Sequence, residues 1–454
     1  MSRSDDGERP GPGGRAPERR AAPDRGPDRA RPERTDARPP APPSGGRVAR
    51  RAAAEEPTVK LESAKPSGER AAARRAGKQA TRKRRKRLGV FLLAAVVLLG
   101  AVVGGGLFVF TSFFATPDFE GEGRGDVVVQ VEDGDTTTKI AGMLTESGVV
   151  KSAAAFTRAA AKDDRSRSIQ PGYYQVRFEM SGAAAVALML DPSARIGQLE
   201  IRGGVQLDDT RGGDGSTVPG VLSLISEATC ATLDGERTCV SVEDLRATMS
   251  TTKPAELGVP TWALEAVERA DPVRRLEGLL VPGRYDVKPG APAAEVLSAL
   301  LAASATRLEA AGLVSGAQAI GADPYEVLII SSLVEKEAIT PDMPKVARVI
   351  YNRLGAGQRL ELDSMVNYPL DLQALRTTAA DRAKPGPYNS YTTAGLPPTP
   401  ISAPGNNAIS AALTPEPGAW YFFVRCKTDG SSCFAETFAD HSRNVQAARA
   451  AGAF

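Results

Sequence analysis

The chain has 454 residues, enough for two or three domains, and a formal net charge of only +3, which gives no reason to expect a nucleic-acid-binding protein. Residues 1–87 are rich in Arg, Pro, Ala and Gly and almost lack large apolar side chains. Such a segment cannot bury enough apolar surface to offset its ordering entropy. We therefore expect a disordered tail at 1–87, with a docking segment for a partner as the alternative to a plain solvated leader.

A basic run and an apolar run follow directly. Residues 82–87 read RKRRKR, and no charged residue occurs from Leu88 to Phe114. A spanning helix needs about 20 apolar residues. Basic clusters can bind nucleic acid, but one placed directly before an apolar span is the positive-inside signal and also contacts anionic lipid. The apolar run is too long, and lies too far along the chain, for a cleaved signal peptide. We predict a single-pass plasma-membrane helix at 88–114, with a cytoplasmic N-terminus and extracytoplasmic C-terminal domains.

The four cysteines lie on the side predicted to be extracytoplasmic. Cys230 and Cys239 close the stretch CATLDGERTC, and Cys426 and Cys433 close CKTDGSSC. Disulfides persist in such a compartment. Zinc is the alternative, but the two pairs are far apart and contain no Cys-x-x-Cys spacing. The pattern predicts two local disulfides, Cys230–Cys239 and Cys426–Cys433.

A linker at 115–126 leads to a small unit at 127–201. VVVQVEDGD alternates like a strand, two helical patterns follow, and GYYQVRFEM reads as a second strand. This β-α-α-β order and size are typical of carbohydrate-binding LysM modules, and a small spacer without a ligand is the equal alternative. Residues 202–454 form the larger remainder, in which LEGLLVPGRYDV indicates a fixed loop. The fold class is therefore α+β.

The segment GADPYEVLIISSLVEKEAITP holds the strongest catalytic candidate. Asp323 suits a helix N-cap, Pro324 the first helical position, and Pro341 prevents the helix from continuing. Residues two apart on a helix differ by about 200°, so Glu335 and Glu337 cannot share a face. Glu337 follows the apolar residues Ile330, Leu333 and Val334, whereas Glu335 follows Ser331 and Ser332 on a more polar side. A carboxyl on an apolar face near a helix C-terminus should have a raised pKa, which suits a general acid.

The alternative for Glu337 is a structural ion pair with Arg348 or Arg353. Glu335 and Lys336 are interpreted mainly as solvated or structural. A second helix, DMPKVARVIYNRLG, presents Val346, Val349, Ile350 and Leu354 at core spacing and Asn352 and Arg353 on its polar face.

Two later stretches add polar and aromatic candidates. Glu361 and Asp363 lie two residues apart in GQRLELDSMVNYPLD, in extended or loop structure. YNSYTTAGLPPTPISAPG mixes Tyr388, Asn389 and Tyr391 with prolines, which favours an ordered, sugar-binding loop over a packed connector. His441, the only histidine, lacks a partnering nucleophile motif and is interpreted as structural or as a residue at the edge of a cleft.

Several of these stretches together resemble a known family. SSLVEKEA, VARVIYNRLGAGQRLELDSMVNY, YNSYTTAGLPPTPISAPG and CFAETFADH occur in the order found in the YceG-like family, the membrane-anchored endolytic murein transglycosylases called MltG. The resemblance covers roughly residues 88–454, including the apolar span, the LysM-like unit and LEGLLVPGRYDV. The family's catalytic glutamate, the second Glu of E-K-E, corresponds to Glu337. Soluble lytic transglycosylases have Ser or Thr after the acid, where this chain has Ala338.

The resemblance implies cleavage of the β-1,4 bond between N-acetylmuramic acid and N-acetylglucosamine within glycan strands, giving 1,6-anhydro-muramic ends and limiting nascent strand length. Glu337 would be the acid and then the base, because the muramoyl 6-hydroxyl replaces water and a second catalytic carboxylate. Tyr388, Asn389 and Tyr391 are the main candidates for holding the sugar, with Asp363 and Glu335 as lesser ones. No metal or cofactor is required.

The partners implied are peptidoglycan glycan strands and membrane lipid, with peptidoglycan synthases or the division and elongation machinery as further candidates and no nucleic acid. Two other functions stay open. A muramidase-type hydrolase would need a second carboxylate, for which Asp363 or Glu361 is the best candidate. A non-catalytic glycan-binding scaffold would use the LysM-like unit and the tail.

Overall fold

A computed structural model describes residues 91–104, 116–373 and 377–453. The predicted tail at 1–87 lies outside the described residues, as does part of the predicted span at 88–114. Its described part is an apolar helix, Phe91–Gly104. No single described helix is both long and apolar enough to cross a membrane, although the bent pair Ala293–Ala310 and Leu313–Ala319 passes the same test by length and composition.

The small unit has a three-stranded antiparallel sheet in the order β1-β2-β3. Its elements are β1 (Glu122–Val131), α2 (Thr137–Glu146), α3 (Ala153–Ala160), η1 (Asp164–Ser168), β2 (Gly172–Met180), α4 (Gly182–Met189), η2 (Pro192–Ala194) and β3 (Arg195–Ile196). Leu144, Phe156 and Val176 are fully buried in its own core. The β-α-α-β order expected from the sequence is present. The strand that follows this unit buries Leu199 and Ile201 in the larger core.

The larger unit combines short strands with many helices, so the chain has a mixed α+β fold. Its strands are β4 (Gln198–Ile201), β5 (Thr210–Gly212), β6 (Thr217–Val218), β7 (Ala231–Leu233), β8 (Glu236–Thr238), β9 (Gly283–Asp286), β10 (Leu372–Gln373), β11 (Phe422–Arg425) and β12 (Ser432–Ala435). They pair as the antiparallel ribbons β4–β9, β7–β8 and β11–β12, and as a sheet in which β5 lies between β10 and β6.

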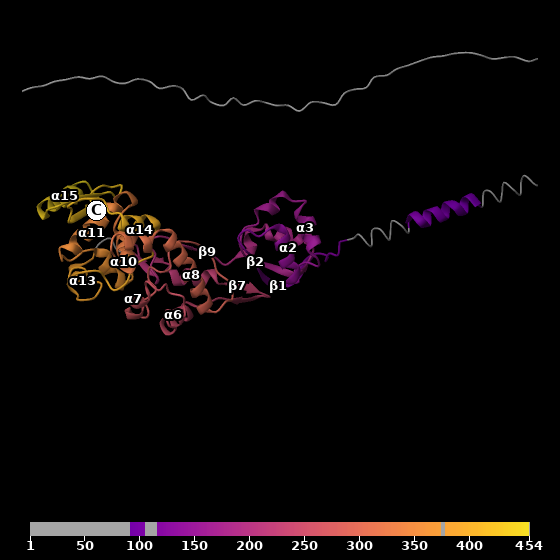
Figure 1. Ribbon diagram of the computed structural model, residues 1–454, viewed down its shortest axis with the longest axis horizontal. Helices are drawn as coiled ribbons and strands as arrows, with labels where there is room; N and C mark the ends of the chain where they lie inside the picture. The colour runs from indigo at the N-terminus through magenta and orange to yellow at the C-terminus, as the bar shows by residue number, and fades with distance from the viewer. Residues whose placement is uncertain (1–90, 105–115, 374–376, 454) are drawn as a thin grey trace, which may run out of the picture. The chain divides into compact units, whose positions relative to one another are not determined.

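Helices supply most of the core of this unit. They are α5 (Val221–Ala228), α6 (Val242–Thr251), α7 (Leu264–Arg269), α8 (Ala293–Ala310), α9 (Leu313–Ala319), α10 (Pro324–Glu337), α11 (Met343–Gly355), α12 (Asp363–Asn367), α13 (Ala379–Ala383), α14 (Asn406–Leu413) and α15 (Phe438–Ala450), with the 3-10 turns η3 (Thr340–Asp342) and η4 (Tyr368–Leu370). Helix α10 packs against α9, α11, α12 and α14. Figure 1 shows α10 beside α11 and α14. The candidate catalytic helix is therefore a central helix of the core.

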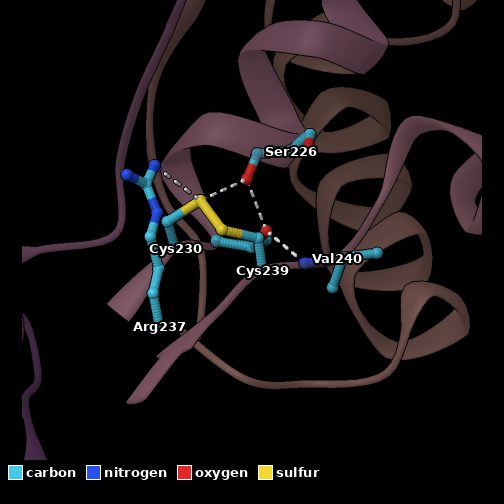
Figure 2. Close-up of a disulfide and its surroundings, with 6 residues drawn as sticks. Ser226, Cys230, Arg237, Cys239 and Val240 are labelled. Carbon is cyan, nitrogen blue, oxygen red and sulfur yellow. Dashed lines mark hydrogen bonds between the residues drawn. A yellow bond between two sulfur atoms is a disulfide. The ribbon is translucent and has the colours of Figure 1, made fainter. Parts of the chain in front are cut away.

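Two disulfides close short hairpins. Cys230 and Cys239 flank the β7–β8 ribbon, and Cys426 pairs with Cys433 at the β11–β12 ribbon. Figure 2 shows the first disulfide, where the Arg237 guanidinium donates to Cys230 Sγ and the Cys230 sulfur contacts the carbonyl of Ser226. Every cysteine of the chain lies in one of these two bonds.

Candidate active site

Glu337 is the last residue of helix α10. The Asp323 carboxylate caps the helix by accepting from the N–H groups of Tyr325 (2.8 Å) and Glu326 (3.1 Å). At the other end Ala338 takes an extended conformation, with φ −131° and ψ 145°, so the helix ends before Pro341. The residues one and two turns before Glu337 are buried, as the helical spacing predicted. The Glu337 carboxyl therefore leaves the helix beside the hydrophobic core.

The opposite side of α10 differs from the sequence-based expectation. Ser331 and Ser332 are fully buried, and their hydroxyls donate to the carbonyls of Val327 and Ile329, each at 2.7 Å. Serine can occupy a buried helix in this way because its hydroxyl finds an acceptor one turn back along the same helix. There is consequently no polar, solvated side behind Glu335. The middle of α10, residues 327–334, is buried, whereas Glu326 in its first turn is exposed and residues 335–337 in its last turn are partly exposed.

Ser364, at the start of α12, holds one oxygen of Glu337. Its hydroxyl donates to Glu337 Oε1 at 2.5 Å and its backbone N–H donates to the same atom at 3.3 Å. Burial raises the pKa of Glu337, and the negative charge of Asp363 raises it further. The hydrogen bonds from Ser364 and the charge of Lys336 lower the pKa, but burial is the largest cause. The carboxyl is thus favoured in its protonated form while it keeps donors that stabilise the anion.

The predicted alternative, a structural ion pair for Glu337, does not occur in the described part of the chain. Arg348 donates to the carbonyls of Glu416 and Pro415. Arg353, expected on the polar face of α11, is only 6% exposed and donates to the carbonyl of Tyr421 at 2.6 Å. Both guanidiniums are used to join α11 to the C-terminal segments. The raised pKa of Glu337 is therefore not offset by a direct cationic partner among the described residues.

Asp363 lies next to Ser364 and is occupied by three neighbours. It accepts from the hydroxyls of Thr377 (2.6 Å) and Tyr391 (2.8 Å), and the Arg382 guanidinium lies 3.3 Å from its Oδ1. Burial and the neighbouring carboxylate raise the pKa of Tyr391, so its phenol stays protonated and continues to donate. The structure thus brings Asp363 and Tyr391 together beside Glu337, and three neighbouring side chains hold Asp363 in place.

Tyr388 and Asn389 are buried. Tyr388 is 7% exposed, its ring lies 4.9 Å from that of Tyr368, and its hydroxyl is 2.8 Å from that of Thr399. Asn389 is 5% exposed, and its amide donates to the carbonyls of Asp381 and Arg382 in α13 and of Lys384, the residue that follows this helix. Its oxygen accepts from the N–H of Tyr391 at 2.9 Å. These side chains order the loop that carries Tyr391 and have little surface left for a ligand.

The two other carboxylates expected near the site, Glu361 and Glu335, each accept a hydrogen bond from a different donor. Glu361 accepts from the buried Arg353 at 2.9 Å and has a positive φ of 54°. Glu335 accepts from the backbone N–H of Gly405 at 3.0 Å. His441 stacks on Phe422 with ring centroids 5.3 Å apart, and burial lowers its pKa. Among the residues that the structure describes, no group of three or more His, Cys, Asp or Glu side chains could hold a metal ion.

Glu277, in the segment LEGLLVPGRYDV, is a buried carboxyl that sequence reasoning did not select. It is 2% exposed and accepts from the N–H of Leu207 (3.1 Å) and the hydroxyl of Tyr368 (3.0 Å). Burial raises its pKa to about 8. Tyr368 begins η4, directly after α12, so Glu277 anchors the far end of the segment that carries Ser364. The adjacent glycine, Gly278, has a φ of 75°, in keeping with the fixed loop expected there.

Sequence reasoning also missed Ser364, Thr377 and Arg382. Ser364 directly follows Asp363 in LELDSMVNY, so its position in that motif was an available signal. Thr377 and Arg382 stand in a stretch without a recognisable pattern. They contact Asp363 from 14 and 19 residues further along the chain, and no local spacing in the sequence reports such contacts.

Comparisons with known proteins identify one protein family. A model of the YceG-like family matches residues 129–447, which include Glu337, Asp363 and Tyr391. Over 177 residues the chain is 32% identical to an endolytic murein transglycosylase of Streptococcus pneumoniae serotype 2 (strain D39 / NCTC 7466), a match covering 38% of this chain and 32% of that protein. The chain therefore matches about a third of the length of this relative.

Two further matches cover most of the length of the protein that is compared. An endolytic murein transglycosylase of Bacillus subtilis (strain 168) is 24% identical over 342 residues, covering 75% of this chain and 89% of that protein. The crystal structure of a YceG-like protein from Listeria monocytogenes superposes with a TM-score of 0.47 at 24% identity, covering 70% of this chain and 98% of that one.

Proposed function

The chain belongs to the YceG-like family, and from that premise we propose that it is an endolytic peptidoglycan lytic transglycosylase anchored in the plasma membrane. Its relatives in Streptococcus pneumoniae and Bacillus subtilis are both named endolytic murein transglycosylases. The observation that carries the proposal is the environment of Glu337, a carboxyl with a pKa raised by burial, held through one oxygen by Ser364.

The proposed reaction needs one catalytic carboxyl. Protonated Glu337 gives its proton to the oxygen that links C1 of N-acetylmuramic acid to O4 of N-acetylglucosamine, and the C1–O4 bond breaks. The resulting carboxylate then takes the proton of the muramoyl 6-hydroxyl as O6 bonds to C1. The products are a 1,6-anhydro-muramic end and a free 4-hydroxyl, and Glu337 recovers its proton. The 6-hydroxyl is held within the substrate itself, so its effective concentration is high.

The contacts of Glu337 suit both halves of this cycle. Burial favours the protonated acid, as general acid catalysis near neutral pH requires. Once the proton has left, the hydroxyl and N–H of Ser364 stabilise the carboxylate. No hydrogen bond reaches Oε2 from the described side chains and backbone, so this oxygen is the one we assign to proton transfer.

The roles of the neighbouring residues follow from their burial. Tyr391 is partly exposed beside Asp363 and is the residue of the loop that we assign to sugar contact. Tyr388 and Asn389 support that loop from inside. Asp363 is occupied by Thr377, Tyr391 and Arg382, which disfavours the hydrolase alternative, because a second catalytic carboxylate would have to activate water.

The remaining parts of the proposal come from the sequence. We infer a cytoplasmic tail at 1–87, a membrane helix at 88–114, a linker at 115–126, a LysM-like unit and an extracytoplasmic catalytic domain. Glycan strands are the substrate, lipid surrounds the span, and synthases or the division and elongation machinery are candidate partners. Cleavage within strands would limit nascent strand length.

The test is product analysis with the full-length protein in detergent and purified glycan strands. Mass spectrometry should detect 1,6-anhydro ends, and the Glu337→Gln variant should produce fewer by about a thousandfold or more, because the amide cannot donate a proton. Reducing ends would instead indicate a hydrolase, and binding without cleavage a glycan-binding scaffold. Full activity of Glu337→Gln would refute the assignment of the acid.

A further inference from the structure

The orientation of Glu337 depends on what holds the end of its helix. Glu337 is the terminal residue of α10, and the carbonyl groups in the last turn of a helix lack intrahelical N–H donors, so this turn tends to fray. A general acid must nevertheless stay within hydrogen-bonding reach of one oxygen of the substrate. Contacts outside the helix therefore have to fix this turn, and the two residues before Glu337 make them.

Glu335 caps a different helix. Its Oε2 accepts from the backbone N–H of Gly405 at 3.0 Å. Gly405 is the N-cap residue of α14 (Asn406–Leu413) and has no side chain with which to cap it. A carboxylate at a helix N-terminus satisfies an N–H group that lacks an intrahelical partner and is favoured by the helix dipole. Glu335 thus supplies from α10 the cap that α14 lacks.

The other oxygen of Glu335 lies against the loop at 203–205. A Cβ atom at Gly203 would lie 2.4 Å from Glu335 Oε1, so a larger residue there would displace the carboxylate. Lys336 contacts the same loop, because its Nζ donates to the carbonyl of Gly204 at 3.2 Å. The N–H of Gly204 in turn donates to the carbonyl of Ala403 at 2.8 Å. The end of α10 is consequently tied to two loops that are also tied to each other.

We propose that Glu335 and Lys336 are positioning residues, which fix the last turn of α10 against the loops at 203–205 and 403–405 so that Glu337 faces the substrate. The inference rests on the proposed function, because it concerns the placement of the proposed acid. From the sequence, Glu335 was interpreted mainly as solvated or structural and was only a lesser candidate for substrate contact, and the inference takes the structural interpretation further. In the E-K-E triplet, the first two residues hold the helix end and the third performs the chemistry.

The test compares variants that keep or lose the contact to Gly405, in the full-length protein acting on purified glycan strands. Glu335→Ala should lower kcat by about ten- to a hundredfold with little change in KM, because misplacement of a catalytic group by about 1 Å has effects of this size. Glu335→Gln should keep most of the activity, since its amide oxygen still accepts from Gly405. Glu326→Ala, at the exposed start of the same helix, is the matched control and should be unaffected.

Gly203→Ala provides an independent perturbation. It should resemble Glu335→Ala, because its Cβ displaces the same carboxylate. The double variant Glu335→Ala/Gly203→Ala should lose little more kcat than Glu335→Ala alone, because the contact to Gly405 is already lost. The double-mutant cycle should therefore be strongly non-additive. If Glu335→Ala does not fold, as judged by its thermal midpoint, Glu335→Gln and Gly203→Ala still decide the matter.

Two results would overturn the inference. Equal losses in Glu335→Gln and Glu335→Ala would mean that the charge itself acts on substrate. Unchanged activity in Glu335→Ala and Gly203→Ala, with Glu337→Gln inactive, would mean that the contact to Gly405 has no positioning role. An active Glu337→Gln variant would instead refute the proposed function, so the two failures can be told apart.

Discussion

Glu277 allows a quantitative prediction of how stability depends on pH. Its carboxyl is buried beneath the segment that carries Ser364, and burial raises its pKa from an ordinary value of 4.5 to about 8. The N–H of Leu207 and the hydroxyl of Tyr368 lower the pKa by a smaller amount, as does the charge of Arg274, whereas the charge of Asp208 raises it. The folded protein therefore binds a proton that the unfolded chain releases.

The sign of the effect follows from this difference. Below about pH 4.5 the carboxyl is protonated in both states and contributes no pH dependence. Between pH 4.5 and about 8 only the folded state keeps the proton, so the free energy of unfolding falls as pH rises. Each pH unit across that range costs about 1.4 kcal/mol. The full loss is on the order of 5 kcal/mol, a large fraction of the stability of a typical domain.

Glu277→Gln removes the titration and keeps an oxygen that can accept from Leu207 and Tyr368. We expect the variant to be close to the wild type in stability at pH 5 and to gain on it by several kcal/mol by pH 8. Denaturant unfolding of both proteins at pH 5, 6.5 and 8 measures the difference, and Glu326→Gln serves as an exposed control on α10. Wild-type and Glu277→Gln curves that run parallel with pH would refute the reasoning.

Three further predictions concern the acid and its supporting loop. Ser364→Ala removes a hydrogen bond that lowers the pKa of Glu337, so the alkaline limb of the pH–rate profile should move to higher pH, with a kcat loss of about tenfold. Asp363→Asn removes a charge that raises the pKa of Glu337, so the alkaline limb should move to lower pH. Shifts in the same direction for both variants would contradict the assignment of this limb to Glu337. Gly278→Ala should destabilise the protein by about 1–3 kcal/mol in denaturant unfolding, because residue 278 has a φ of 75° and the added Cβ would lie 2.5 Å from Pro400 Cβ. An unchanged free energy of unfolding would contradict this.

The sequence predicted well those features that depend on local spacing. Asp323, Pro324 and Pro341 mark the two ends of α10, and the 3.6-residue period alone separates Glu335 from Glu337. Cap chemistry and helical periodicity are properties of about a dozen consecutive residues, so no knowledge of the tertiary structure is needed to use them. The same holds for the β-α-α-β order of the small unit.

Features that depend on long-range packing were predicted less well. Ser331 and Ser332 suggested a solvated side, but the middle of α10, residues 327–334, is buried on every side, and each hydroxyl finds its acceptor within the helix. Tyr388 and Asn389 suggested a sugar-binding surface, but the same hydrogen-bonding capacity orders a loop from inside. Polarity in a sequence shows that a group needs a partner, and not whether that partner is a ligand or the protein itself.

The contacts of Asp363 and Glu337, the two carboxyls beside Ser364, suit the proposed role of Glu337 as a single catalytic acid. Asp363 is held in place by Thr377, Tyr391 and Arg382. Its negative charge adds to burial in raising the pKa of Glu337. Ser364 opposes that rise through two donors on a single oxygen of Glu337. A residue that must first give and then regain a proton needs both influences on its pKa. An acid that is too weak would not protonate the leaving oxygen, and a carboxylate that is too stable would not accept the 6-hydroxyl proton. The residues around Glu337 therefore tune a single group, which is what a reaction with an internal nucleophile requires.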